Sequence, residues 1–461
     1  MNDGTAINLN SLLEVIHFVA ERPKRNTQWM KQDTPVDQLR QLLRQNRAGV
    51  RKGIYSVCSA NRFVLDAAFV QAKSNGSLLL VEATCNQVNQ EGGYTGQTPA
   101  QFRDDVHGIA AEIRFPLERL VLGGDHLGPN PWRAQPAEVA IQKACAMVAA
   151  YAEAGFSKIH LDASMPCADD PRALGQTIIA ERAARLCEAA ETAAGGRAGQ
   201  LVYVIGTEVP TPGGALNEMQ IEVTTTDGLR ETLNVHRSAF KRRKLLPAWE
   251  RVIAAVVQPG VEFGDDTVAG YNPTKAAGLS RFIRQQEGIV FEAHSTDYQS
   301  EEALTQLVRD HFAILKVGPE LTFMMREAVF GLARIEEEWI PEGRRSNLRA
   351  IIERVMLEHP ENWEAYYHGD NDAVRVARAF SFSDRIRYYW RDSAVSAALD
   401  ALLDNLRTCP APWPLVRQYL PEQATAIRVG SIANEPRAMI RHKIQGILSR
   451  YARSCGLVPQ A

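Results

Sequence analysis

The sequence predicts an α/β fold, a TIM (β/α)8 barrel with an N-terminal helical extension and a C-terminal helical subdomain. Eight short apolar runs, most of them ending in polar, charged or glycine residues, alternate with helical stretches across residues 53–338. The runs are apolar on both faces, as in LLLV at 78–81, which is typical of parallel strands covered by helices. The count of eight favours a closed ring over an open doubly wound sheet, because no GxGxxG follows the first run.

The expected elements follow one another in regular order. Strands are predicted at residues 53–59, 77–84, 119–126, 158–164, 201–208, 253–258, 289–294 and 313–317. Helices are predicted at 62–74 and 99–114, and a helix at 321–338 closes the ring. The loop 85–98 is long and rich in glycine, which favours a functional loop, with an ordinary strand–helix connection as the alternative.

The chain divides into three predicted regions. Residues 1–37 are expected to form an arm with an amphipathic helix at 10–21, either an oligomer contact or a helix packed on its own barrel. The barrel is expected at 38–344. Residues 345–461 do not continue the repeat and are expected to form a helical subdomain on the barrel. Its helices are predicted at 348–357, 363–366, 372–379, 395–406 and 436–451.

Composition excludes several classes of partner. The 461-residue chain has a net charge of −2 and no long basic tract, which argues against nucleic acid. Its seven cysteines are scattered without a CxxC pair, which fits reduced thiols. No apolar run approaches the roughly 20 residues of a membrane span, and residues 1–9 lack the features of a secretion signal. A cytoplasmic protein without a membrane partner is expected.

Acidic and imidazole side chains gather at the predicted carboxyl ends of the strands, where barrel enzymes place their active sites. His160 and Asp162 lie two residues apart on one strand and therefore face the same way, as do Glu292 and His294. Such a mixed set suits a divalent cation with open positions for substrate. The preferred metal ligands are His126, Glu208 and His294, with His160 as the alternative.

Zn²⁺ is the preferred ion, with Mn²⁺, Co²⁺, Ni²⁺ and Mg²⁺ as alternatives. Histidines that only form hydrogen bonds in a barrel mouth remain the competing interpretation. The candidates for general acid–base catalysis are Glu82, Asp125, Asp162 and Asp297. The candidates for substrate contacts are Ser59, Asn86, Gln87, Gln258, Glu292, Lys316 and Gly318.

Two places offer positive charge or amides for an anion. The last strand carries Lys316, and Gly318 then opens a helix, an arrangement that often binds phosphate in barrels. A lysine that is salt-bridged inside the barrel mouth is the alternative for Lys316. Arg385 and Arg387 could reach a phosphate in the barrel, but a bridge between the subdomain and the barrel surface is the favoured interpretation for them.

Long segments of the chain carry a resemblance to a known family. They are GIYSVCSA, LLLVEATCNQVNQEGGYTGQTP, LGGDHLGPNPW, KIHLDASM, YVIGTEVPTPGG, VVQPGVEF, FEAHSTDYQ, FAILKVGP, YYHGD and SFSDRIRYYW. From about Leu39 to its C-terminal region the chain resembles the GatZ/KbaZ family. The resemblance implies a TIM barrel of the class II aldolase superfamily. Members of the family have been named second subunits of tagatose-bisphosphate aldolase, tagatose-6-phosphate or fructose 4-epimerases, and tagatose 6-phosphate kinases.

Two functions follow from the resemblance and the residues together. The first is a metal-dependent 4-epimerase of tagatose or fructose, preferably the 6-phosphate, acting by retro-aldol and aldol chemistry between C3 and C4. The second is a non-catalytic subunit that stabilises a class II D-tagatose-1,6-bisphosphate aldolase. The acid–base and metal-ligand set favours the enzyme, and no GxxxxGK[ST] loop supports a kinase. The expected partners are a sugar or sugar phosphate, a second copy of the chain and possible contact with a catalytic aldolase subunit, without a nucleotide cofactor.

Overall fold

The computed structural model describes residue 1 and residues 33–206 and 221–458. The described residues from Pro35 onward form one compact unit, so residues on both sides of position 344 belong to the same body. The helix predicted at 10–21 and the candidate ligand Glu208 lie outside the described residues. Among the helices that the structure describes, none is both long and apolar enough to cross a membrane.

Parallel strands close into an eight-stranded barrel, which confirms the predicted fold class. The first strand pairs with the second and with the last, so the ring has no open edge. The barrel strands are β1 (Ile54–Val57), β2 (Leu79–Thr84), β3 (Leu120–Leu127), β4 (Lys158–Leu161), β5 (Val202–Ile205), β6 (Val252–Val256), β9 (Val290–Ala293) and β10 (Phe312–Val317). An antiparallel hairpin that was not predicted, β7 (Glu262–Phe263) with β8 (Val268–Ala269), lies between β6 and β9 in the chain.

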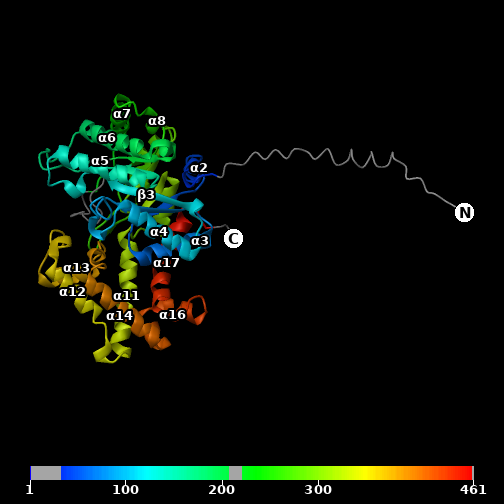
Figure 1. The fold of residues 1–461 in the computed structure, drawn as a ribbon, viewed down its shortest axis with the longest axis vertical. Coiled ribbons are helices and arrows are strands. Elements are labelled where there is room, and N and C mark those ends of the chain that lie inside the picture. The colour runs from blue at the N-terminus through cyan, green and yellow to red at the C-terminus, as the bar shows by residue number, and fades with distance from the viewer. Residues whose placement is uncertain (2–32, 207–220, 459–461) are drawn as a thin grey trace. The chain divides into compact units, whose positions relative to one another are not determined.

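Helices that follow the barrel strands in the chain surround the barrel (Figure 1). Their ends follow local sequence signals. The helix after β2 starts at a capping box formed by Thr98 and Gln101, and the helix after β1 ends at Gly76 in the left-handed conformation. These helices are α3 (Arg62–Asn75), α4 (Pro99–Ile113), α5 (Ala137–Glu153), α6 (Gln176–Ala194), α7 (Thr226–Arg242), α8 (Leu246–Trp249), α9 (Pro273–Ile283), α10 (Glu301–Arg309) and α11 (Pro319–Trp339).

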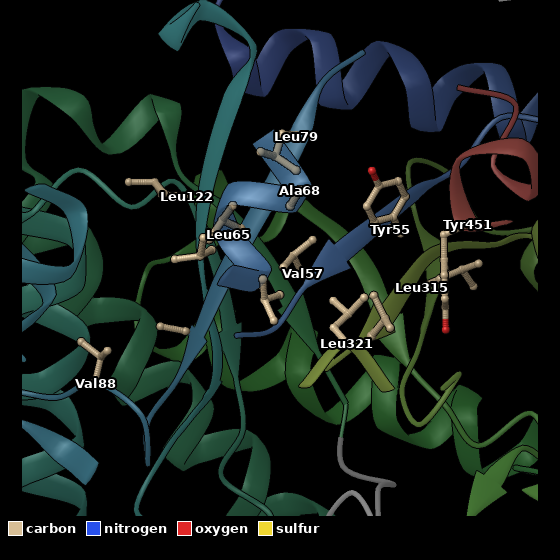
Figure 2. Packing of buried hydrophobic residues seen from close by; sticks show 14 of the residues in the cluster. Tyr55, Val57, Leu65, Ala68, Leu79, Val88, Leu122, Leu315, Leu321 and Tyr451 are labelled. Atoms are coloured by element: carbon tan, nitrogen blue, oxygen red, sulfur yellow. The ribbon is translucent and has the colours of Figure 1, made fainter. Parts of the chain in front are cut away.

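Further helices follow α11, and several of them gather on the side of the barrel away from α6, α7 and α8 (Figure 1). They are α12 (Leu348–Glu358), α13 (Asn371–Phe380), α14 (Ser393–Thr408), α15 (Trp413–Tyr419), α16 (Pro421–Arg428) and α17 (Pro436–Ser454). The last helix, α17, returns to the barrel and packs on α3, α10 and α11. Figure 2 shows Tyr451 of α17 among core residues of the barrel wall, and its ring centroid lies 6.0 Å from that of Tyr55.

The prediction of a helix at 363–366 is wrong. A short 3-10 helix (Pro360–Asn362) starts at a proline there and is followed only by turns. The indole nitrogen of Trp363 donates to the carbonyl of Met356 at 2.6 Å, so the segment folds back on the end of α12 instead of forming a helix of its own. The short helices α15 and α16 were missed from the sequence.

A helix ahead of the first strand, α2 (Pro35–Arg47), closes the N-terminal end of the barrel. Its Val36, Leu39 and Leu43 recur at intervals of three and four residues and belong to the buried cluster that fills the barrel interior. Arg47 at its end donates to the carbonyl of Ile289, just before β9. Because apolar side chains occupy this end, the polar strand ends form a site at the opposite end of the barrel.

Candidate metal and substrate site

Three histidines, here called the histidine cluster, meet at the carboxyl ends of the strands. The ring centroids of His126, His160 and His294 lie 4.6, 5.0 and 5.2 Å apart. Each ring has a carboxylate at one nitrogen. The pairs are His126 Nδ1 with Asp162 at 2.7 Å, His160 Nδ1 with Asp125 at 3.1 Å, and His294 Nε2 with Glu292 at 3.1 Å. A carboxylate placed in this way orients the ring and, on His126 and His294, favours a proton on the paired nitrogen, so that the other nitrogen can bind a metal. Nδ1 of His160 also lies 3.2 Å from the backbone nitrogen of His126, which can donate to it.

A bulge in β3 explains how the neighbouring residues Asp125 and His126 both serve this cluster. Consecutive strand residues normally point to opposite faces of a sheet. The register between β3 and β4 shifts between Gly124 and Leu127, and His126 has a left-handed φ of 47°. The bulge therefore turns two adjacent side chains toward the same histidine–carboxylate pairs.

Two buried lysines lie deeper in the barrel. The Nζ of Lys158 is 2.5 Å from Glu82 and 2.7 Å from Glu292. Lys316 contacts Glu82 and lies 2.8 Å from Asp125 and 3.4 Å from Glu292. Lys316 is therefore a salt-bridged lysine inside the barrel mouth, which was the alternative prediction for it. Lys158 was missed from the sequence, although it stands two residues before His160 and therefore on the same strand face.

The charges of this region fit a divalent cation. In the described part of the chain, the buried carboxylates Glu82, Asp125 and Glu292 and the partly exposed Asp162 face two ammonium groups, which leaves two negative charges when the imidazoles are neutral. Ligand atoms within 4.8 Å of one another come from Asp125, His160, Glu292 and His294, and from His126, His160 and Asp162. His160, the alternative ligand of the sequence prediction, belongs to both of these sets.

Ring nitrogens that lack a hydrogen-bond partner, or that face another lone pair, also fit a divalent cation at this site. Nε2 of His160 is buried and has no hydrogen-bond partner in the described part of the chain. Nε2 of His126 lies 3.0 Å from Nδ1 of His294, and the carboxylates favour the lone-pair form of both atoms. Without a cation, a second proton on His126 satisfies this contact. Burial lowers the pKa of His126, but its carboxylate neighbours outweigh burial and raise it to about 9.

A cleft with a volume of about 170 Å³ opens over the histidine cluster. The predicted site residues that line it are Ser59, Asn86, Gln87, Asp125, His126, Asp162, His294, Asp297, Lys316 and Gly318. Glu82 and Glu292 are fully buried behind this surface and act on it through their ion pairs. Gln258 is not part of the lining, because its side-chain oxygen accepts hydrogen bonds from the backbone of Gly260 and Val261 in its own turn.

Comparison with known proteins gives this site a family context. The model of a family described as D-tagatose-1,6-bisphosphate aldolase subunit GatZ/KbaZ-like matches residues 39–456. The chain belongs to the GatZ/KbaZ-like family. The resemblance expected from the sequence motifs is therefore confirmed.

Several solved structures are similar to this GatZ/KbaZ-like chain. A probable tagatose 6 phosphate kinase from Sinorhizobium meliloti 1021 is 46% identical, with 88% of this chain and 100% of that chain covered and a TM-score of 0.82. A fructose-bisphosphate aldolase from Campylobacter jejuni is 13% identical, covering 82% and 93%, with a TM-score of 0.45. The YdjI aldolase from Escherichia coli K12 is 10% identical, with 80% of this chain and 94% of that chain covered and a TM-score of 0.38. The two aldolases are too distant to bear on function.

In this GatZ/KbaZ-like chain the backbone amides at the start of α11, just after β10, bind the side chain of Asp297. Its Oδ1 accepts hydrogen bonds from the backbone nitrogens of Gly318 at 3.0 Å and Glu320 at 2.8 Å, at the N-terminus of α11. The amide that was expected to bind a phosphate therefore already has an internal carboxylate partner. Burial, together with the nearby Glu320, raises the pKa of Asp297 to about 7.

Residues 381–391, here called the arginine segment, form a wall of the cleft, and of their lining residues only Arg387 was a candidate from the sequence. The segment lies between α13 and α14, and its lining residues are Arg387, Tyr388, Trp390 and Arg391. Asp384 pairs with Arg326 of α11 at 2.7 Å, and the backbone nitrogen of Phe382 donates to the carbonyl of Asp265 at 2.8 Å. The segment is more than 220 residues away in sequence from the histidines of β3 and β4, so no local pattern connects them.

Proposed function

We propose that this chain is a metal-dependent ketohexose 4-epimerase that breaks and remakes the C3–C4 bond of tagatose or fructose, preferably as the 6-phosphate. The observation that supports this most is the histidine cluster, in which each imidazole is oriented by its own carboxylate at the base of a cleft. Convergent imidazoles and carboxylates with excess negative charge are what a catalytic divalent ion requires. Zn²⁺ is the preferred ion because its ligands are nitrogen and oxygen atoms of this kind.

The chemistry of the sugar selects bond cleavage. The C4 hydrogen of a 2-ketohexose is β to the carbonyl and is not acidic, so direct deprotonation cannot invert C4. In the proposed reaction the C4 hydroxyl loses its proton, and the electrons of the C3–C4 bond pass to C3 and the C2 carbonyl, giving an aldehyde and an enediolate. The aldehyde rotates and adds back, and the proton returns to the C4 oxygen. A divalent ion in the histidine cluster would supply Lewis acidity to the C2 and C3 oxygens.

Asp297 is the preferred residue for holding the C4-hydroxyl proton. It lines the cleft, and its pKa of about 7 allows it to accept and return a proton near neutral pH. Burial alone raises the pKa of Asp125 and Asp162, but the neighbouring imidazoles outweigh burial and lower both, which makes them weaker bases. Glu82 is the remaining candidate, and it is held by two lysines behind the cleft surface.

The second candidate function is a non-catalytic subunit of a class II D-tagatose-1,6-bisphosphate aldolase. The description of the matching family, which names a subunit of that enzyme, favours it. A kinase is the weakest candidate, although the similar protein from Sinorhizobium meliloti carries that name, because the sequence has no GxxxxGK[ST] loop for nucleotide phosphates.

An assay of the purified chain separates the two candidates. The substrates are fructose, tagatose and their 6-phosphates, each with and without EDTA. Epimerisation that chelation abolishes and added divalent metal restores is the result expected of the enzyme. Absence of turnover on every substrate, together with a stable complex with an aldolase subunit, is the result expected of the helper.

Substitution of individual histidines tests the metal ligands. We expect His160→Ala and His294→Ala each to lower metal affinity at least tenfold, measured as metal content after dialysis against a competing chelator. Glu208→Ala extends the test to the predicted ligand outside the described residues. His107→Ala, on the half-buried face of α4, is the control and retains metal. Unchanged metal content and turnover in both cluster variants would show that the site assignment is wrong.

A further inference from the structure

The arginine segment brings positive charge to the cleft without a matching carboxylate. Arg387 donates to the carbonyl of Ser383 and to the hydroxyl of Tyr388, the latter at 3.0 Å. Arg391 donates to the carbonyl of Thr95 and to the side-chain oxygen of Gln97. Within the described ranges, neither guanidinium forms an ion pair with an Asp or Glu side chain, and both line the cleft.

Neighbouring arginines differ from these two. Arg326 is neutralised by Asp384 at 2.7 Å, and it does not line the cleft. Arg385 precedes Arg387 by two residues but points elsewhere, since it donates to the carbonyl of Asn362 at 2.8 Å and its guanidinium lies 3.1 Å from the ring centroid of Tyr366. Among the described arginines of this segment, Arg387 and Arg391 are therefore the two whose uncompensated charge lines the cleft.

Arg387 is held in place through aromatic contacts that lead toward the predicted sugar-binding residues. Its guanidinium lies 4.5 Å from the ring centroid of Tyr388, and that ring is in edge contact with Tyr94 at 4.8 Å. The backbone nitrogen of Tyr94 in turn donates to the carbonyl of Asn86. Because Asn86 and Arg387 line the same cleft, one ligand can contact both.

We infer that Arg387 and Arg391 are the residues that bind the phosphate group of the proposed ketose 6-phosphate in this cleft. The inference deepens the proposed function and rests on it for the identity of the sugar. Two uncompensated guanidinium groups match the charge of a phosphate, which is about −1.5 to −2 at neutral pH. Their planar donor groups also match phosphate oxygens in geometry. The phosphate contact thus comes from the arginine segment and not from the occupied amide of Gly318.

Binding of inorganic phosphate tests this site without reference to turnover. Calorimetric titration of the intact protein with phosphate is compared for the wild type, Arg387→Gln, Arg391→Gln and the matched control Arg385→Gln. We expect at least tenfold weaker binding for Arg387→Gln, a smaller loss for the more exposed Arg391→Gln, and wild-type binding for the control. Equal affinity in the wild type and Arg387→Gln overturns the inference, as does an equal loss in the control.

Turnover supplies a second, separable result. If the chain is an epimerase, Arg387→Gln should lower kcat/KM for the 6-phosphate at least tenfold more than for the free sugar. An equal loss on both sugars overturns the inference. If the wild type turns over no ketose but Arg387→Gln still binds inorganic phosphate more weakly than the wild type, the proposed epimerase activity is wrong and the phosphate site is supported. Arg387→Lys keeps the positive charge but lacks the planar pair of guanidinium donors. We expect it to bind phosphate with an affinity between those of the wild type and Arg387→Gln, and it replaces the Gln variant in the test if that variant folds poorly.

Discussion

Asp297 differs from the other carboxylates of the site in the charges that surround it. The aspartates of β3 and of the loop after β4 face imidazoles, which favour their ionised forms. Asp297 instead faces Glu320 in a buried position, and backbone amides, its own and those at the start of α11, stabilise its negative charge. The same residue type therefore holds its proton at one place of the cleft and loses it at another.

This difference predicts a pH effect on stability. Folded Asp297 keeps its proton up to a pKa of about 7, whereas an unfolded aspartate loses it near pH 4. Its stabilising contribution is complete below about pH 4 and is lost as the pH rises to about 7, with a slope of at most about 1.4 kcal/mol per pH unit. Asp297→Asn should lack this decline in urea unfolding between pH 4.5 and 7. Parallel pH profiles for the two proteins would contradict the assigned environment.

At the scale of elements, the turn after β3 is built around a glycine that permits close approach of another strand end. A Cβ placed on Gly128 would lie 1.6 Å from the carbonyl oxygen of Asp162. Asp162 in turn orients His126. The absence of a side chain at Gly128 therefore lets two successive loops meet where the histidine cluster needs them.

Alanine at two glycines separates this packing requirement from ordinary backbone entropy. Gly128→Ala should destabilise the fold by several kcal/mol and weaken metal binding, because the backbone of Asp162 has to move. Gly108→Ala, in the middle of α4 with no atom within 4 Å of its Cβ, should stabilise the protein by about 0.5–1 kcal/mol. Unfolding midpoints and metal content provide both measurements. A Gly128→Ala protein with wild-type values would show that the loops do not need this contact.

At the scale of the whole molecule, the barrel depends on α2 to complete its interior. Leu39 is fully buried in the cluster formed with the inward-facing strand residues, whereas Leu42 on the same helix is only half-buried. Leu39→Ala should lower the free energy of unfolding by about 2–5 kcal/mol. Leu42→Ala should cost clearly less. Equal losses in denaturant unfolding would indicate that α2 does not fill the barrel end.

The parallel strands could be predicted because burial on both faces leaves continuous apolar runs in the sequence. The same pattern places the strand ends at one rim, so His126, His160, Asp162 and His294 could be assigned to one site before any coordinates were known. The hairpin of β7 and β8 could not be predicted in this way, because each strand has only two residues.

Other parts of the site depend on contacts that sequence spacing does not encode. Arg387 and Trp390 reach the cleft from a segment far along the chain, held there by pairs such as Arg326 with Asp384. The ion pairs of Lys158 depend on strand neighbours on other parts of the ring. The helix α2 left a clear signal in the spacing of its apolar residues, but the polar residues between them concealed its role as part of the core.

The closed end of the barrel has a kinetic consequence for the proposed reaction. In the described part of the chain α2 seals one end, so a fragment released at the histidine cluster leaves through the cleft, past the contact of Tyr94 with Tyr388. An aldehyde that rotates before it escapes yields the epimer, and one that escapes first yields cleavage products. The ratio of epimerase to aldolase activity then measures the lifetime of the trapped fragment, which the cleft wall sets without any change in the catalytic groups.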